Sequence, residues 1–293
     1  MTTATPARGL IALLRLPYWL MTGGLSLLTA FAITKNPLSL SVQTVLLIFF
    51  SMAFITSAGF AINDYFDRES DAVIKPKRPI PSGALSLKQV VAISGLLFTL
   101  GLIMASFINP LSFAIIAVDS LLLLIYSFLI KRKSGFTANV LVGILTGTAF
   151  MYGQATITTP ATVNLISLSL YPIAFGTIGG NVLRDILSID GDSKVGYPTL
   201  PQKIGRINSA KVAALFFLLT GVLAPLPYFL GNFTVYYLPL ILLWSVLLIY
   251  ASIRLVTSAS TVSNVRKYER IVTMSMILLP LALIIEAIFG GLI

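Results

Sequence analysis

The sequence predicts an all-α membrane protein with many spans, and three observations lead to this fold class. Of the 293 residues, 57% are hydrophobic and only 10% are charged, whereas a soluble domain carries about a quarter charged residues. The apolar segments are long and uniformly apolar, which favours membrane helices over the alternating strands of a barrel. The length accommodates nine such spans of about 20 residues each. We therefore expect one membrane domain over residues 1–293, with no separate soluble domain.

The nine expected spans are separated by short polar segments. They cover residues 17–34, 40–62, 88–108, 111–130, 137–157, 163–183, 210–230, 234–256 and 271–290. The stretch before the first span carries Arg8 and Arg15 and lacks the small-residue cleavage pattern of a signal peptide, so we expect a short amphipathic segment there. Acidic clusters follow the second and the sixth spans, which are equivalent positions in two runs of four spans. This predicts two four-helix halves plus one final helix.

The basic residues are distributed very unevenly between the two sides of the predicted bundle. Of the 20 lysines and arginines, 19 precede the first span or lie between an even-numbered span and the next, and only Lys35 falls on the other side. The positive-inside rule then predicts a multi-pass cell-membrane protein with a cytoplasmic N-terminus and an external C-terminus. The net charge of +10 is explained by orientation against an anionic leaflet, so no nucleic-acid partner is expected.

The residue types that are missing exclude several kinds of chemistry. The chain has no cysteine and no histidine. Disulfides, thiolate nucleophiles, histidine acid–base catalysis and metal binding by either side chain are therefore excluded. Seven of the ten acidic residues gather in the two clusters, which we expect in loops on the cytoplasmic side.

The first acidic cluster, residues 63–71, places three carboxylates at a helical spacing. Asp64, Asp67 and Asp71 are three and four residues apart, so a helix that continues beyond the second span would present all three on one face. Carboxylates this close repel one another unless positive charge lies among them. A hard divalent cation supplies it well, because Mg²⁺ prefers oxygen ligands with a phosphate completing its shell.

The second acidic cluster, residues 184–192, repeats this arrangement. Asp185 and Asp192 are seven residues apart, again on one helical face. Two such faces opposite each other would hold metal ions that carry a diphosphate. The alternative for each cluster alone is a solvated loop of mixed charge. The occurrence of both clusters at equivalent positions on one side of the membrane favours the metal site.

The two clusters resemble the paired signatures of the UbiA superfamily of intramembrane prenyltransferases. The segment 63–83 matches the first signature at Asn63, Asp64, Asp67 and Asp71. The segment 184–201 resembles the second signature, with matches at Asp185, Gly191, Asp192, Gly196, Thr199, Leu200 and Pro201. The middle aspartate of that signature falls at Ser188, and Asp190 is a candidate to replace it. The segment 126–147 is similar to the family's connection between the fourth and fifth spans.

The resemblance implies nine helices around a central cavity, with two Mg²⁺ ions under a cytoplasmic cap and the prenyl chain in an apolar tunnel. The expected metal ligands are Asn63, Asp64, Asp67, Asp71, Asp185, Asp190 and Asp192, and all of these except Asp190 are also expected to be catalytic. Basic side chains would stabilise the departing diphosphate, and the candidates are Arg78, Lys131, Arg132, Lys194 and Arg15. The alternative is that these basic side chains only set the orientation of the protein in the membrane. The expected cavity residues are Tyr126, Asp119 and Asn139.

Two acidic residues fall inside predicted spans, where carboxylates are costly and suggest function. Asp119 lies seven residues before Tyr126, hence on a similar helical face, and is expected to line the cavity. Glu286 lies near the external end of the last span, and we expect its carboxylate simply to reach water.

The segments RPIPSG and RDI…GD…TLP look most like the archaeal ether-lipid members of the family. Those enzymes transfer geranylgeranyl from its diphosphate to the hydroxyl of geranylgeranylglyceryl phosphate. The partners expected from this resemblance are a prenyl diphosphate, a lipid acceptor and membrane lipid. An aromatic quinone precursor or a tetrapyrrole is the alternative acceptor. A secondary transporter is a more distant alternative, because its acidic residues would lie near the bilayer midplane and its repeats would be inverted.

Overall fold

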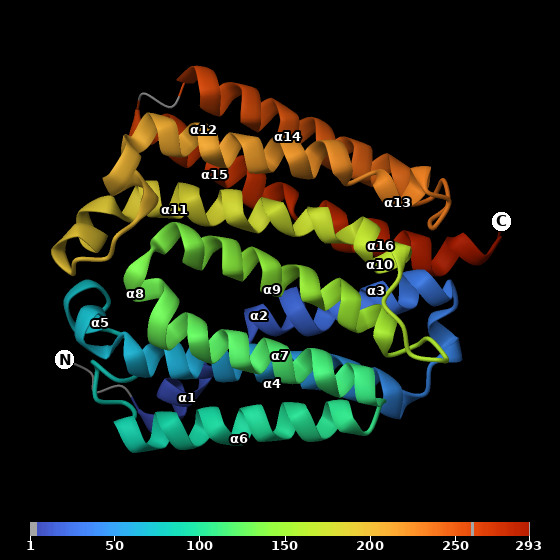
Figure 1. Cartoon of the computed structure of the whole chain (residues 1–293), viewed down its shortest axis with the longest axis horizontal. Helices are drawn as coiled ribbons and strands as arrows, with labels where there is room; N and C mark the ends of the chain where they lie inside the picture. The colour runs from blue at the N-terminus through green and yellow to red at the C-terminus, as the bar shows by residue number, and fades with distance from the viewer. Residues whose placement is uncertain (1–4, 259–260, 293) are drawn as a thin grey trace.

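The computed structural model describes residues 5–258 and 261–292, a bundle of long helices that lie side by side (Figure 1). Within these residues no strand occurs, and nine helical segments are long and apolar enough to cross a membrane. The nine predicted spans are therefore confirmed. Residues 1–4, 259, 260 and 293 of the predicted domain lie outside the described residues.

The helical elements follow one another along the chain with short connections, η marking 3₁₀- and π-helices. They are α1 (Pro6–Leu14), α2 (Pro17–Trp19), η1 (Leu20–Gly24), α3 (Leu25–Thr34), η2 (Pro37–Ser39), α4 (Val42–Phe66), α5 (Arg68–Ile74), α6 (Leu87–Ser106), α7 (Pro110–Ile125), η3 (Tyr126–Ile130), α8 (Lys131–Lys133), α9 (Gly135–Ala155), α10 (Leu165–Leu170), η4 (Tyr171–Ala174), α11 (Phe175–Lys194), α12 (Leu200–Leu223), α13 (Leu226–Phe229), α14 (Leu238–Ser258), α15 (Val262–Ser275), α16 (Leu278–Phe289) and η5 (Gly290–Leu292).

The two predicted four-span halves pack side by side, and the ninth span joins them. In the first half α4 lies along α6, and in the second half α11 lies along α12, which in turn lies along α14. The halves meet where α9 contacts α3 and α7. The last span contacts both halves, because α15 packs on α11 and α14 while α16 packs on α3 (Figure 1).

Several of these helices begin at a residue whose side chain caps the N-terminal end of the helix. Ser86 begins α6 with a capping box, in which its hydroxyl accepts from the Gln89 backbone N–H at 3.3 Å and the Gln89 side chain accepts from the Ser86 N–H at 2.8 Å. Asn109 caps α7 in the same way as Ser134 caps α9, by accepting a backbone N–H three residues ahead. These caps determine the residue at which each of the three helices begins.

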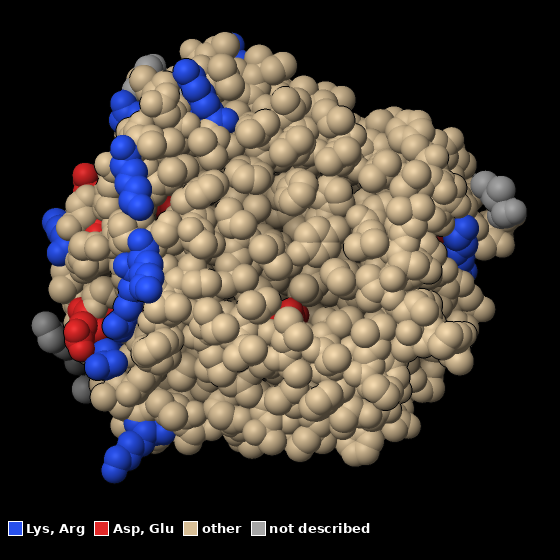
Figure 2. Space-filling model, viewed as in Figure 1, with Lys and Arg blue, Asp and Glu red and all other residues tan. Residues whose placement is uncertain are grey.

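Most of the charged side chains lie at the ends of the bundle. Figure 2 shows lysines and arginines gathered along the edge where α5 and α8 lie in Figure 1, beside a broad face nearly free of charge. A small basic group appears at the opposite edge. This is the arrangement that the uneven distribution of basic residues predicts.

Glu286 contradicts the prediction that its carboxylate reaches water. The residue is fully buried, and its carboxylate accepts hydrogen bonds from the Thr234 backbone N–H at 2.9 Å and from the Thr234 hydroxyl at 2.7 Å. Lys35 lies 4.0 Å away and supplies the opposite charge. Glu286 thus ties α16 to the segment before α14, since a buried carboxylate needs such partners.

Two helices extend beyond the predicted ends of their spans, α4 by about one turn and α11 by about three. The prediction that the acidic clusters lie in loops is therefore wrong. α4 continues to Phe66 and carries Asp64 in its last turn, and α11 continues to Lys194. Asp185, Asp190 and Asp192 therefore lie on a helix. The physical reason is that hydropathy reports where lipid ends, whereas hydrogen bonding along the backbone lets a helix continue into the polar region.

Gly153 permits close contact between the two halves, and its replacement by alanine is expected to destabilise the bundle. A Cβ at this position would overlap the Ser26 carbonyl of α3 and lie 2.9 Å from the Thr29 Cβ. We expect a cost of about 1–3 kcal/mol, seen as a lower unfolding temperature in detergent. Gly180→Ala is the control, because no atom of the described residues lies within 4 Å of its added Cβ. Equal unfolding temperatures for the two variants would contradict this packing.

Candidate functional site

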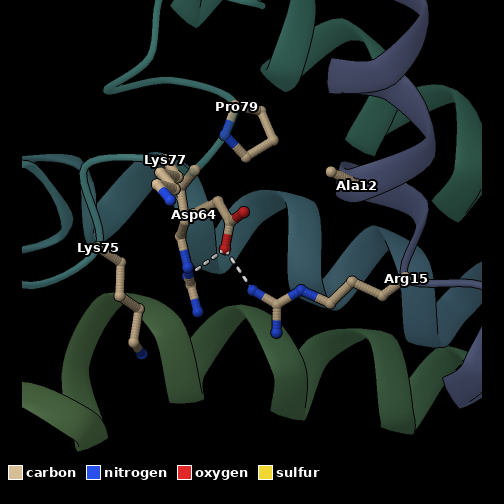
Figure 3. Close-up of a pocket in the computed structure, with 7 residues that line it drawn as sticks. Ala12, Arg15, Asp64, Lys75, Lys77 and Pro79 are labelled. Carbon is tan, nitrogen blue, oxygen red and sulfur yellow. Dashed lines mark hydrogen bonds and ion pairs between the residues drawn. The ribbon is translucent and has the colours of Figure 1, made fainter. Parts of the chain in front are cut away.

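Asp64 lies at the end of α4 and is held by two guanidinium groups. Arg15 and Arg78 each donate to its Oδ1 atom at 2.6 Å, although the side chain of Asp64 is only 3% exposed. Arg15 ends α1 in a left-handed conformation, with φ 49°, and this turn separates α1 from α2. The Arg15 side chain extends from there toward Asp64 (Figure 3).

Asp67 marks the junction of α4 and α5 and has three side-chain partners, two of which come from distant parts of the chain. Its Oδ2 atom accepts from Asn63 at 2.7 Å and forms an ion pair with Lys131. Its Oδ1 atom accepts from the Tyr197 hydroxyl at 2.7 Å. Lys131 follows the π-helix η3, which interrupts the α-helical register at the end of α7. Such interruptions are frequent at functional sites.

Asp71 completes the first cluster from α5. Arg78, which also contacts Asp64, donates to its Oδ2 atom at 2.9 Å. Burial raises the pKa of the Asp71 carboxyl, and the adjacent Arg78 opposes that rise. The structure therefore brings Asn63, Asp64, Asp67 and Asp71 together with Arg15, Arg78 and Lys131, as the sequence predicts.

The second acidic cluster presents Asp185 and Asp192 along one side of α11. Asp185 Oδ2 accepts from the Asn139 side chain of α9 at 2.7 Å. Asp192 Oδ2 accepts from the Ser188 hydroxyl at 2.6 Å, so Ser188 shares the face of these two aspartates. Lys131 interacts electrostatically with Asp185 as well as pairing with Asp67. Lys131 therefore lies close to both clusters.

Asp190 does not share this face. It lies about 140° around α11 from Asp185, given 100° per residue, and it is exposed. The structure therefore favours Ser188 rather than Asp190 as the polar group between the two aspartates.

Tyr197 is a site residue that sequence reasoning missed. It follows α11 in the connection to α12, yet its hydroxyl donates to Asp67 and lies 2.8 Å from the Ser70 hydroxyl. The Lys131 ammonium lies 5.1 Å from the centre of its ring. Burial of the ring raises the pKa of the Tyr197 hydroxyl, so it remains a donor. The only signal in the sequence was its position between the matching residues Gly196 and Thr199 of the second signature.

Removing the Tyr197 hydroxyl is expected to weaken the link between the two clusters. We expect Tyr197→Phe to raise the Mg²⁺ concentration for half-maximal activity by about tenfold, because a hydrogen bond to a charged group contributes about 1.5–3 kcal/mol. The measurement is a titration of the enzymatic activity with Mg²⁺. Tyr250→Phe, at an exposed tyrosine of α14, is the control. An unchanged Mg²⁺ requirement in Tyr197→Phe would contradict this role.

The remaining predicted residues lie around the cluster rather than in it. Arg132 donates to the Phe66 carbonyl at 3.1 Å and contacts no acidic side chain of the described residues. Lys194 is exposed at the end of α11. Tyr126 lies within electrostatic range of both Asp67 and Asp185. Asp119 lies about two turns deeper on α7, where its Oδ2 atom accepts from Thr148 at 2.7 Å.

The residues of the two clusters fit a hard divalent cation that arrives with a phosphate. Within the described residues, no three acidic side chains converge closely enough to hold a metal alone. Mg²⁺ needs only one or two carboxylates when substrate phosphates complete its shell. Asn63 Oδ1 is buried without a hydrogen-bond partner among the described residues, and such an atom normally has one. A cation beside Asp67 would satisfy it.

The sequence of the chain is similar to a known family of enzymes. Residues 19–279 match the model of the UbiA prenyltransferase family. The chain is 37% identical over 235 residues to digeranylgeranylglyceryl phosphate synthase of Natronomonas pharaonis, with 79% of this chain and 81% of that protein covered.

Solved structures show the same fold. A structure of digeranylgeranylglyceryl phosphate synthase aligns over 97% of this chain and 99% of that one, with 29% identity and a TM-score of 0.79. A UbiA homologue from Archaeoglobus fulgidus bound to GPP and Mg²⁺ aligns over 94% of this chain and 99% of that one, with 21% identity and a TM-score of 0.67.

Proposed function

Since the chain belongs to the UbiA prenyltransferase family, we propose that it transfers geranylgeranyl from its diphosphate to the hydroxyl of geranylgeranylglyceryl phosphate, with Mg²⁺ as cofactor. The protein is a multi-pass membrane prenyltransferase. The acceptor is supported by relatives that are named digeranylgeranylglyceryl phosphate synthase. The observation that carries the proposal is the cluster of acidic and basic side chains around Asp64 and Asp67 at one end of an apolar bundle.

The position of this cluster suits the shape of the proposed donor. A prenyl diphosphate joins a long hydrocarbon to a highly charged head, so its two ends require lipid-like and polar surroundings respectively. The cluster lies where α4 and α11 extend past their apolar segments. The head therefore meets charged side chains while the hydrocarbon stays among apolar helices. We place this end of the bundle, with the N-terminus, on the cytoplasmic side, as the positive-inside rule requires.

Two Mg²⁺ ions are proposed, one for each cluster. The first cluster would hold its ion through Asn63, Asp67 and Asp71, and the second through Asp185 and Asp192. When bound, Mg²⁺ would neutralise charge that grows on the leaving diphosphate. A bound Mg²⁺–GPP pair in the Archaeoglobus fulgidus homologue supports the use of a divalent metal.

Basic side chains of this chain are proposed to stabilise the leaving diphosphate. Lys131 pairs with Asp67 and lies within electrostatic range of Asp185. Arg78 bridges Asp64 and Asp71. Fixed cations directed at the position where charge develops stabilise a transition state without reorganisation. Arg15 lies next to them, and the exposed Arg132 and Lys194 add positive charge at the edge of the site.

Asp64 is proposed to accept the proton of the acceptor hydroxyl. Arg15 and Arg78 both contact its Oδ1 atom (Figure 3). This arrangement fixes the carboxylate and directs Oδ2 as the base. Tyr126, Asn139 and Asp119 are proposed to line the path of the reacting carbon and the prenyl chain.

The acceptor is tested by offering alternatives in parallel. Purified protein in lipid nanodiscs would receive Mg²⁺, radiolabelled geranylgeranyl diphosphate and either geranylgeranylglyceryl phosphate, 4-hydroxybenzoate or chlorophyllide. We expect a doubly prenylated glyceryl phosphate that EDTA abolishes. Product only with an aromatic or tetrapyrrole acceptor would overturn the acceptor assignment and keep the family chemistry.

A further inference from the structure

A pocket of about 380 Å³ lies beside Asp64, between α1 and the segment 75–79 (Figure 3). Its lining is Ala12, Arg15, Asp64, Lys75, Lys77, Arg78 and Pro79. Four of these side chains are cationic and one is acidic, so the pocket has a large excess of positive charge. In Figure 3, Lys75 and Arg15 extend from opposite sides of Asp64. Such a pocket selects an anion.

The four cations of this pocket fall into two pairs. Arg15 and Arg78 are already engaged with Asp64. Lys75 and Lys77 form no ion pair with a carboxylate of the described residues. Their charge is therefore available to a ligand, and an ammonium group is an effective point charge for phosphate.

This pocket lies beside the space between the two acidic clusters and shares Asp64 with the first of them. None of the residues that line it comes from α8, α9 or α11, whereas the proposed diphosphate site lies between Asp67, Lys131 and the aspartates of α11. The proposed reaction brings together two phosphorylated molecules. Each needs its own positive charge, because two phosphates in one place would repel.

We propose that this pocket binds the phosphate monoester of the lipid acceptor, with Lys75 and Lys77 as its ligands and Arg15 and Arg78 as the wall shared with the diphosphate site. The inference rests on the proposed function. In a glyceryl phosphate lipid the free hydroxyl lies on the carbon next to the phosphate-bearing carbon. A phosphate held in this pocket therefore places that hydroxyl beside Asp64, the proposed base.

The test compares Lys75→Ala/Lys77→Ala with the matched double variant Lys203→Ala/Lys211→Ala, whose lysines are exposed on α12. Each protein, in zwitterionic nanodiscs, is offered geranylgeranylglyceryl phosphate or its phosphate-free alcohol, geranylgeranylglycerol. We expect the first variant to raise the KM for the phosphorylated acceptor by at least about tenfold, because charge-assisted contacts to phosphate are lost. The KM for geranylgeranyl diphosphate and turnover of the alcohol should match the control variant.

Equilibrium binding of the two radiolabelled lipids, without donor and without Mg²⁺, separates this inference from the proposed function. Weaker binding of the phosphorylated lipid alone in Lys75→Ala/Lys77→Ala supports the pocket even if the wild type transfers no prenyl group. A raised KM for the donor would show that these lysines serve the diphosphate, and would overturn the inference. Unchanged binding and an unchanged acceptor KM would overturn it as well.

Discussion

Asp67→Asn is expected to lower kcat/KM by at least about three orders of magnitude, the largest effect of any substitution considered, because it removes a proposed metal ligand and the charge that organises its neighbours. Asp67 is the junction of the site, since Asn63, Lys131 and Tyr197 all converge on its carboxylate. An amide at this position keeps the shape of the side chain but loses the negative charge. The measurement is the initial rate of radiolabelled prenyl transfer at saturating Mg²⁺.

The control for Asp67→Asn is Glu69→Gln, which removes one negative charge two residues away. The Glu69 side chain is 86% exposed, and among the described residues it contacts only the neighbouring Arg68. Its loss should therefore leave the rate within about twofold, as for most exposed charges. Comparable losses in the two variants would mean that the net charge of this segment, rather than the position of Asp67, controls activity.

Lys131→Ala is expected to lower kcat by about two to three orders of magnitude, because the departing diphosphate loses a fixed cation directed at it. Lys131 forms an ion pair with Asp67 and lies within electrostatic range of Asp185, so it is a basic residue close to both clusters. Lys131→Arg should retain part of the activity, since the charge remains while the geometry changes. The measurement is single-turnover transfer with both substrates bound.

Lys133→Ala is the matched control for Lys131→Ala. Lys133 lies two residues further along α8 and is exposed. It carries the same charge as Lys131 but lacks the ion pair with Asp67. Its variant should react at close to the wild-type rate. Full activity in Lys131→Ala would remove this lysine from the mechanism.

The fold was largely predictable because lipid imposes a simple requirement on the sequence. Each span must be apolar over about 20 residues, so nine apolar segments predict nine crossing helices. Helix ends were less predictable, because hydrogen bonding along the backbone carries α4 and α11 past the apolar limit. The prediction for the external end of the last span was wrong, because Glu286 is buried there. Its hydrogen-bond partner Thr234 lies 52 residues away in the sequence.

The candidate site was partly predictable for a related reason. The spacing of Asp64, Asp67 and Asp71 indicated a shared face, and their cationic partners could be proposed from charge alone. Tyr197 could not, because its contact with Asp67 joins residues 130 positions apart and depends on how the chain after α11 folds back. The π-helix before Lys131 likewise has no simple pattern in the sequence. Tertiary packing decides both features.

The most direct test of the account is a structure of the protein with Mg²⁺ and a non-reactive thiolodiphosphate analogue of geranylgeranyl diphosphate. The account predicts two Mg²⁺ ions and the diphosphate between the two acidic clusters. Asn63, Asp67 and Asp71 should surround one ion, Asp185 and Asp192 the other, and Lys131 should contact the diphosphate. It also predicts that the prenyl chain lies among the apolar helices. Metal or diphosphate bound elsewhere, with the ion pair between Asp67 and Lys131 unchanged, would contradict it.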